Sequence, residues 1–428
     1  MQAVRDREAI EILKANDRGG YTVPTSRLYP YQWNWDSVFV ALGFHTFDKD
    51  RAWREIEMLF DGQWDDGMVP HILFRRDDPD YFPGPSVWRA GGAIQSSGHS
   101  QPPVAASVVC ALVEAGGEEG ERRGRSLFDK LLAYHRWFHR HRDPHGKGVI
   151  GVVHPWESGR DNSADWDYAM RQVRIAPDLG TYQRRDTAHV DADQRPKQAE
   201  YDRFLTLVTF GRDQGWNQDT IAREGQFFVA DPGNHFILMR ADRDLLRLAE
   251  RFGKTIEADE IRAWLTASEV GTNLIWNDDV SAFCARDFRS GQFSDAISSS
   301  AALVFYAGAG SEEQRALMID HLQRIMDNVA FGLPSLDPDH ARFEPKRYWL
   351  GPVWMVMNFM IARGLAEAGH VALAEQIKAG SRQLIEEQGF YEYFDPVTGE
   401  GCGGGDFSWT AAMWLAWAGR HGEAAEAA

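Results

Sequence analysis

Several stretches of the chain carry hydrophobic residues at helical spacing along one side only. Residues 127–139 form such a single stripe, which is typical of a helix with one buried face. Ser311 and Gln314 have the spacing of an N-terminal capping box before a similar stretch over 317–325. Residues 257–275 belong to the same class. These patterns predict helices on the outside of the fold.

A second kind of stretch is hydrophobic on almost every side. A helix without a polar face must be surrounded by other helices, so these stretches are predicted to lie inside. Six of them alternate with one-sided helices, which predicts an all-α fold of two concentric rings, an (α/α)6 barrel. The predicted inner helices cover residues 38–44, 104–113, 204–210, 298–306, 353–361 and 409–417.

Strand signals are short and few. Residues 147–153, 281–288 and 389–395 follow predicted helices, and we expect them to form short β-hairpins in the loops at one rim. The polar stretches 116–125 and 423–428 are too short to divide the chain. We therefore expect one catalytic domain over residues 1–428.

The segments that precede the hydrophobic stretches are rich in polar and aromatic residues. If the inner helices run parallel, their N-termini all open at the same end of the barrel. Residues that are far apart in the sequence then meet in one cup. The segments are 29–36, 101–103, 195–201, 347–349 and 403–407.

The charge balance restricts the partners of the protein. Lys and Arg number 46 and Asp and Glu number 63, which gives a net charge of -17. A surface of this sign repels phosphate backbones and anionic lipids, so we expect neither a nucleic acid nor a membrane as partner. An anionic substrate would need an arginine committed to it.

Cysteine and histidine usage narrows the class further. Three cysteines without a CxxC pair indicate a reducing compartment, and no stretch resembles a signal peptide or a membrane span. We therefore expect a cytoplasmic protein. The 14 histidines form no metal-binding motif, and His135, His139 and His141, which lie beside arginines, are expected at the surface of an outer helix. No metal and no cofactor are predicted.

The acidic run over residues 154–167 is the first candidate for chemistry. Glu157, Asp161, Asp165 and Asp167 stand close together between Trp156 and Trp166. A carboxyl group that the indoles shield from water has a raised pKa and can act as an acid near neutral pH. The alternative is a polar loop that two tryptophans anchor.

Glu392 is the second candidate, because aromatic residues flank it on both sides. Together with an acid from the first run it would supply the two carboxyl groups that glycoside hydrolysis requires. The alternative for Glu392 is a solvated acid in a turn. The 16 tryptophans are compatible with a sugar site, although most tryptophans fill the core.

At this point the sequence resembles a known family. The run 157–163, the pair Glu392 and Asp395, and the glycine-rich run that ends at Trp409 are similar to glycoside hydrolase family 63 and its trehalase relatives. The compact form of the chain resembles the bacterial mannosylglycerate and glucosylglycerate hydrolases. The resemblance implies an (α/α)6 barrel and an inverting mechanism.

The resemblance also implies roles for individual residues. Asp161 would be the general acid and Glu392 the general base, roughly 6.5 to 9.5 Å apart in an inverting enzyme. Arg195 would hold the carboxylate of glycerate, because a guanidinium fork suits a carboxylate. The remaining residues expected to bind substrate are Tyr29, Trp35, Asp36, Tyr81, Gln101, Trp156, Glu157, Gly159, Tyr201, Tyr348, Trp349 and Asp406.

Alternatives remain at this stage. Within the same barrel family, a trehalase-like or oligosaccharide α-glucosidase activity would leave Arg195 without an anion to bind. A sugar epimerase would need a pair of catalytic histidines inside the cup, and a sugar-binding protein would need only the aromatic residues. The expected partner is a small anionic sugar glycoside; the choice between mannosyl and glucosyl substrates is open, and a homo-oligomer is possible.

Overall fold

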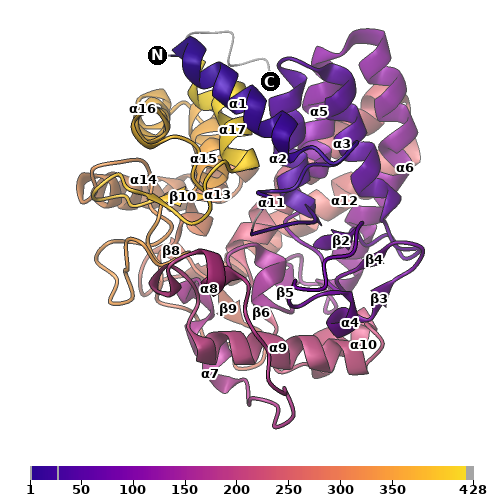
Figure 1. Ribbon diagram of the computed structural model, residues 1–428, viewed down its shortest axis with the longest axis vertical. Helices are drawn as coiled ribbons and strands as arrows, with labels where there is room; N and C mark the ends of the chain where they lie inside the picture. Colours follow the sequence, from indigo (N-terminus) through magenta and orange to yellow (C-terminus); the bar gives the residue numbers. More distant parts are fainter. Residues whose placement is uncertain (1, 27, 421–428) are drawn as a thin grey trace.

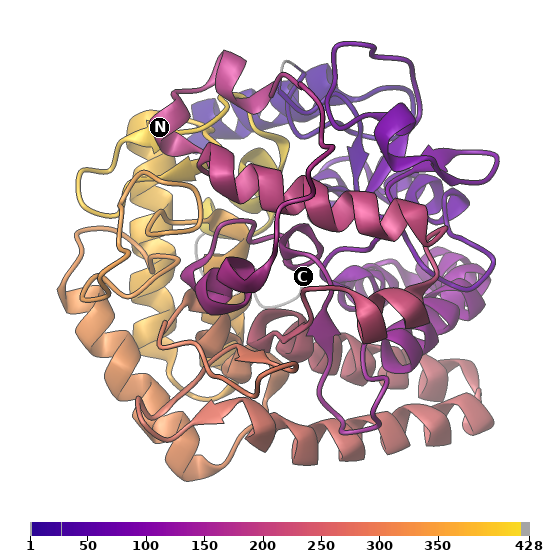
Figure 2. The same cartoon turned by 90° about the horizontal axis from the view of Figure 1, so that it is seen from below.

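The computed structural model describes residues 2–26 and 28–420, whose main helices form two concentric rings (Figures 1 and 2). Neighbouring inner helices pack against each other, and the last one returns to the first, which closes the inner ring. The predicted (α/α)6 architecture is therefore confirmed. The inner helices, in order around the ring, are α2 (Asn34–His45), α5 (Ala105–Ala115), α11 (Pro232–Phe252), α13 (Ser299–Ala307), α15 (Met355–Glu367) and α17 (Ser408–Met413).

Each inner helix packs against one outer helix. In five pairs the outer helix follows its inner partner along the chain, whereas α1 precedes the whole barrel and packs against α17. The first helix therefore completes the pair of the last. The outer helices are α3 (Lys49–Asp61), α6 (Gly117–His141), α12 (Thr255–Gly271), α14 (Glu312–Asp327), α16 (Val371–Gln388) and α1 (Gln2–Asn16), which pair with α2, α5, α11, α13, α15 and α17 in this order.

One predicted inner helix is wrong. Residues 204–210 belong to α9 (Gln198–Asp213), which runs across one end of the barrel and packs against α4 (Pro85–Trp88) (Figures 1 and 2). The inner position is filled by α11 instead. The sequence of α11 carries charged residues, so its pattern does not indicate a buried helix. These charges can be buried because they are paired: the Nε of Arg240 donates to Asp244 at 2.8 Å.

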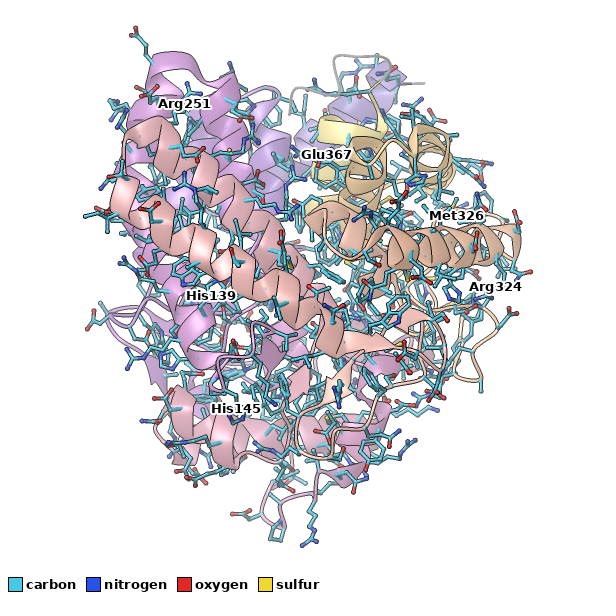
Figure 3. The ribbon with its side chains drawn as sticks, turned by 180° about the vertical axis from the view of Figure 1, so that it is seen from behind. His139, His145, Arg251, Arg324, Met326 and Glu367 are labelled. Carbon is cyan, nitrogen blue, oxygen red and sulfur yellow. The ribbon has the colours of Figure 1, made fainter. Side chains whose placement is uncertain are left out.

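The prediction that the histidines of α6 lie at the surface is also wrong. His135 is fully buried, and its Nδ1 lies 2.7 Å from Asp242 of α11. The Nε2 of His139 lies 2.9 Å from the other oxygen of Asp242, and its ring stacks on Trp264 of α12. Figure 3 labels His139 in the view from behind. His141 is buried as well. A carboxylate partner allows these polar rings to leave water: Asp242 of the inner helix for His135 and His139, and Asp219 for His141.

The strands are short, and they lie in the loops. Two local hairpins match the predicted segments 281–288 and 389–395, whereas the strand in 147–153 pairs with a distant segment. The hairpins are β7 (Trp276–Asn277) with β8 (Ala282–Phe283) and β10 (Tyr393–Phe394) with β11 (Gly401–Cys402). The two further antiparallel sheets are β1 (Gln32–Trp33), β2 (Ile72–Phe74), β4 (Gln95–Ser96), β3 (Ala90–Gly91), and β5 (Gly151–Val152), β6 (Val229–Ala230), β9 (Arg286–Asp287).

Short helices join α9 and the sheets in covering the end of the barrel where the loops before the inner helices meet (Figure 1). Among residues 2–26 and 28–420, no helix has a stretch long and apolar enough to span a bilayer. The short helices are α7 (Asp167–Gln172), α8 (Asp186–His189), α10 (Gln218–Glu224) and the 3-10 turns at Pro155–Ser158, Ala164–Trp166, Ala192–Gln194 and Thr272–Ile275.

The contact between α13 and α15 leads to a stability prediction. A Cβ atom added at Gly364 of α15 would lie 2.2 Å from the backbone nitrogen of Tyr306. We expect Gly364→Ala to lower the free energy of unfolding by about 1–3 kcal/mol, because overpacking outweighs the better helix propensity of alanine. Chemical denaturation followed by circular dichroism measures it. Gly92→Ala, where a Cβ meets nothing within 4 Å, is the control, and equal stability of both variants would contradict the prediction.

Candidate active site

A cavity opens at the covered end of the barrel. About half of its lining side chains are aromatic, as expected for a ligand with flat apolar faces. Six charged side chains also line it: Asp36, Asp161, Arg185, Asp186, Arg195 and Glu392.

Most of the residues singled out from the sequence line this cavity. They come from loops spread over almost the whole chain, so the expected convergence on one cup is confirmed. The predicted residues that line it are Tyr29, Trp35, Asp36, Tyr81, Gln101, Trp156, Gly159, Asp161, Arg195, Tyr201, Tyr348, Trp349 and Glu392.

Glu157 is not among the residues that line the cavity, although substrate contact was predicted for it. Its carboxylate is completely buried and accepts bonds of 2.8 and 2.6 Å from the guanidinium of Arg142. It also accepts a bond of 3.0 Å from the backbone N–H of Val153. Glu157 therefore fixes the loop before Asp161 instead of facing the ligand, and the prediction of direct contact is corrected.

Asp406 is the other predicted residue outside the cavity. Its backbone has a positive φ of 49° in the turn that enters α17, and its exposed side chain lies in a separate outer groove beside α1. The next residue, Phe407, lines the cavity instead. A turn at this point directs successive side chains to opposite sides, so the predicted position was off by one.

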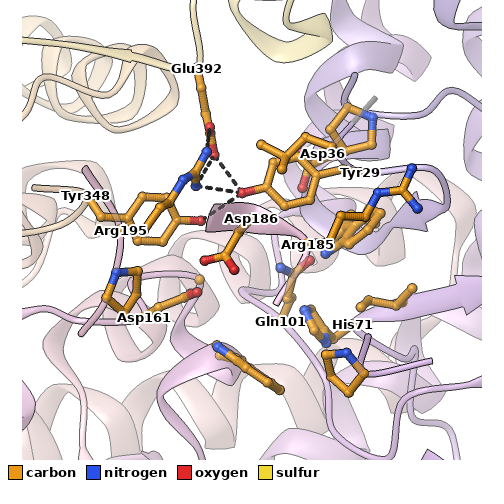
Figure 4. A pocket seen from close by; sticks show the side chains of 18 of the residues that line it. Tyr29, Asp36, His71, Gln101, Asp161, Arg185, Asp186, Arg195, Tyr348 and Glu392 are labelled. Carbon is orange, nitrogen blue, oxygen red and sulfur yellow. Dashed lines mark hydrogen bonds and ion pairs between the residues drawn. The ribbon is translucent and has the colours of Figure 1, made fainter. Parts of the chain in front are cut away.

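The carboxylate of Glu392 is almost fully buried and receives hydrogen bonds from three separate segments. Figure 4 shows the bonds from Arg195 and Tyr29. The guanidinium of Arg195 donates at 2.5 and 3.2 Å, the hydroxyl of Tyr29 at 2.9 Å, and the backbone N–H of Gly404 at 3.1 Å. A Cβ atom at Gly403 would lie 2.4 Å from Oε2 of Glu392, so only glycine fits beside this carboxylate. The negative charge of Glu392 is thus paired inside the protein.

Arg195 has a different partner from the predicted one. Both terminal nitrogens of its guanidinium are bound to Glu392, and one also donates to Tyr29 at 2.8 Å. The guanidinium packs over the ring of Tyr348 at 4.8 Å. Within the described part of the chain, its buried Nε–H has no hydrogen-bond partner. Contact with an anionic ligand therefore remains a prediction.

Asp161 lies across the cavity from Glu392 (Figure 4). Burial raises its pKa to about 7; Arg195 opposes this shift, and the charges of Asp186 and Glu392 add to it. A carboxyl group with this pKa carries a proton over the acidic and neutral range, as a general acid must. Asp161 and Glu392 are therefore in opposite environments.

The loop that carries Asp161 is fixed by buried polar contacts. The guanidinium of Arg160 pairs with Asp165 on the same loop and with Asp231 at the start of α11. The backbone N–H of Trp349 donates to Asn162 at 2.9 Å, which joins the loop to the opposite wall. These contacts restrict the side chain of Asp161 to one side of the cavity.

Asp36 stands at the first turn of α2, at the bottom of the cavity. Burial raises its pKa well above the ordinary value, and the charges of Glu392 and Glu55 contribute. A protonated Asp36 can donate a hydrogen bond to a ligand hydroxyl. The side chain of the neighbouring Gln101 accepts the backbone N–H of Trp35 at 3.2 Å, which fixes the start of α2.

Several residues of the cavity were not predicted from the sequence. His71 and Trp88 come from the four-stranded sheet region, which gave no signal of its own. Arg185 and Asp186 lie in a charged segment at the start of α8, and the charge density there was the only available signal. In the described part of the chain, no group of three or more His, Cys, Asp or Glu side chains is placed to hold a metal ion.

A protonated carboxyl and a charge-paired carboxylate across an aromatic cavity, at one end of an (α/α)6 barrel, define the class of protein: it is a glycoside hydrolase. Residues 29–410 match the family model described as the mannosylglycerate hydrolase MGH1-like glycoside hydrolase domain. The chain therefore belongs to this family.

Individual relatives agree with this assignment. The chain is 44% identical to mannosylglycerate hydrolase MGH1 of Selaginella moellendorffii, over 95% of this chain and 84% of the relative. It is 31% identical to the glucosylglycerate hydrolase of Mycolicibacterium hassiacum, over 96% and 97% of the two chains. The crystal structure of the GH63 mannosylglycerate hydrolase from Thermus thermophilus with Tris and D-glycerate superposes with a TM-score of 0.91, at 42% identity over 96% of this chain and 99% of the other.

The raised pKa of Asp161 predicts opposite effects on activity and stability. The rate should fall as pH rises through about 7, because the proton needed for catalysis is lost. The folded state binds this proton more tightly than the unfolded state, so its ionisation costs stability from about pH 4 upwards. We expect Asp161→Asn to be inactive and to melt above the wild type at pH 8, with the difference disappearing near pH 4.

Melting curves at several pH values test this. Asp178→Asn, which changes an exposed acid, is the control and should melt with the wild type throughout. An Asp161→Asn protein that melts below the wild type at pH 8 would contradict the raised pKa.

Proposed function

We propose that the protein hydrolyses the α-glycosidic bond of mannosylglycerate, glucosylglycerate or both, with inversion, releasing the hexose and D-glycerate. The observation that carries the proposal is the pairing of a carboxyl group with a raised pKa, Asp161, with a carboxylate held in its charged form by donors, Glu392. The relatives are mannosylglycerate and glucosylglycerate hydrolases, which supports the choice of glycoside.

In the proposed mechanism the hexose ring lies between the two carboxyl groups. Asp161 gives its proton to the glycosidic oxygen as the bond to the anomeric carbon breaks. Glu392 removes a proton from a water molecule, which attacks the anomeric carbon from the opposite face. The indoles of Trp35 and Trp349, 6.2 Å apart between ring centroids, provide apolar surface for the faces of the sugar.

The glycerate carboxylate is proposed to meet the guanidinium of Arg195. Its Nε–H is the donor that remains available in the described structure, and the terminal nitrogens are shared with Glu392. A substrate carboxylate at this point is attracted by the same charge that pairs with the base. Binding of the anion and charging of the base are then coupled through one side chain.

The ion pair between Arg195 and Glu392 also gives weight to a second candidate function. If Arg195 serves only the base, the site needs no anion, and a neutral α-glucoside such as trehalose would be a suitable substrate. The overall charge of the cavity does not separate the two cases, so the substrate must be tested directly.

A cytoplasmic location is part of the proposal. All three cysteines are buried and unpaired, which is the usual condition in a reducing compartment.

One prediction of the proposed function concerns the product of the reaction. Wild-type protein incubated with α-mannosylglycerate, α-glucosylglycerate and trehalose should release hexose from one or both glycerates, and proton NMR should show the β-anomer first. Inversion is expected because a water molecule displaces the leaving group in a single step. The α-anomer as first product would rule out the mechanism, and cleavage of trehalose alone would rule out the substrate.

Another prediction separates the two roles of Arg195, which are binding the substrate carboxylate and pairing with Glu392. In Arg195→Lys the positive charge remains but the planar fork is lost. We expect the loss in kcat/KM to be about 10–100 times larger for α-mannosylglycerate than for the neutral α-mannosylglycerol, because only α-mannosylglycerate has a carboxylate to bind. Equal losses on both substrates would assign Arg195 to Glu392 alone. Arg212→Lys, a substitution at the end of α9, is the control.

A further inference from the structure

Asp186 is a cavity residue for which the mechanism above has no use. It is the first residue of α8, and its carboxylate points into the cavity between Asp161 and Gln101 (Figure 4). It is neither the acid nor the base. A further carboxylate in a site that receives an anionic substrate needs a physical reason, because it repels that substrate.

The segment that carries Asp186 contacts the loop that contains Asp78 and Phe82. The Nη1 of Arg185 donates to both carboxylate oxygens of Asp78 at 3.0 Å. The rings of Tyr182 and Phe82 stack with their centroids 4.9 Å apart. The segment therefore bridges to the loop that also supplies Phe82 to the cavity wall, and the position of Asp186 is defined.

The carboxylate of Asp186 accepts hydrogen bonds from Arg184 and can still accept others from a ligand. The Nε of Arg184 donates to one oxygen at 3.0 Å and Nη2 to the other at 2.6 Å. Arg184 is itself fixed by a bond of 2.7 Å to the carbonyl of Pro196 and by stacking over Tyr201 at 4.3 Å. Each carboxylate oxygen can accept two hydrogen bonds, so both oxygens of Asp186 retain acceptor capacity toward the cavity.

Asp186 lies on the side of the cavity where the leaving group departs. The general acid protonates the glycosidic oxygen, so the aglycone must lie next to Asp161. The charge of Asp186 acts on Asp161, and also on Tyr81 and Tyr201 of the same wall. The hexose, by contrast, lies toward Trp35 and Asp36 at the start of α2. Asp186 therefore faces the aglycone.

We propose that Asp186 is a specificity determinant that accepts a hydrogen bond from a hydroxyl group of the aglycone. The inference rests on the proposed function, which makes the aglycone D-glycerate. Its C2 oxygen is part of the glycosidic bond and its carboxylate is repelled by Asp186, so the C3 hydroxyl is the group that Asp186 binds. Attraction of the hydroxyl and repulsion of the carboxylate orient the aglycone in the same sense, with its carboxylate toward Arg195.

The test uses a substrate without that hydroxyl. α-Mannosyl-D-lactate carries a methyl group in place of the C3 hydroxymethyl group of mannosylglycerate and is otherwise the same. We expect wild-type protein to prefer mannosylglycerate over this analogue by about 10- to 100-fold in kcat/KM, because a hydrogen bond to a charged group is lost. In Asp186→Ala the preference should fall to within about threefold of unity.

The ratio of kcat/KM for the two substrates is insensitive to other effects of the substitution. A change in the protonation of Asp161, or a general weakening of the site, alters both substrates equally and leaves the ratio unchanged. Asp178→Ala, which removes an exposed acid of the same segment, is the matched control and should keep the wild-type ratio. If Asp186→Ala does not fold, Asp186→Asn replaces it, since the amide keeps the shape but not the charge.

The outcomes distinguish the inference from the function on which it rests. A wild-type preference that Asp186→Ala or Asp186→Asn retains in full would overturn the role of Asp186 while leaving mannosylglycerate hydrolysis intact. Failure of wild-type protein to cleave mannosylglycerate and glucosylglycerate would overturn the proposed function and the inference together. A preference that collapses only in the Asp186 variants supports the inference.

Discussion

The arrangement of the active site depends on the free-energy cost of removing the carboxylate of Glu392 from water. A buried carboxylate needs donors around it, and here they come from three loops: Tyr29 before α2, Arg195 before α9 and Gly404 before α17. None of these loops contains enough regular structure to hold itself in place. The charge therefore joins segments from the first, middle and last parts of the chain at one point.

The same burial has the opposite result at Asp161. Glu392 is surrounded by hydrogen-bond donors, whereas burial and the charges of two further acids raise the pKa of Asp161. Two carboxyl groups in one cavity are thus assigned different tasks by their surroundings, as in other enzymes that perform acid and base catalysis at one pH. Arg195 takes part in both environments, because it binds Glu392 and opposes the shift of Asp161.

The sequence allowed the barrel and most of the cavity to be predicted because both depend on local patterns. Hydrophobic stretches were visible in five of the six inner helices, and the polar and aromatic loops before four of these five were visible as well. The exception, α11, carries charges such as Arg240 and Asp242, which become buried through the distant partners Glu367 and His135. Glu157 and Arg142 illustrate the same limit: an acid in a motif looks like a site residue until its buried partner is known. The misplacement of Asp406 has another cause, since one positive φ reverses the side that a residue faces.

The pairing of α1 with α17 has a consequence for synthesis of the protein. The barrel closes only when its last inner helix lies between α2, α15 and α1, and that helix is synthesised after the other five inner helices. Until then the apolar surfaces of α2 and α15 have no cover on one side. Glu392 and Gly404 also emerge after five inner helices, so the nascent chain has neither a closed core nor a complete catalytic centre until α17 has been synthesised.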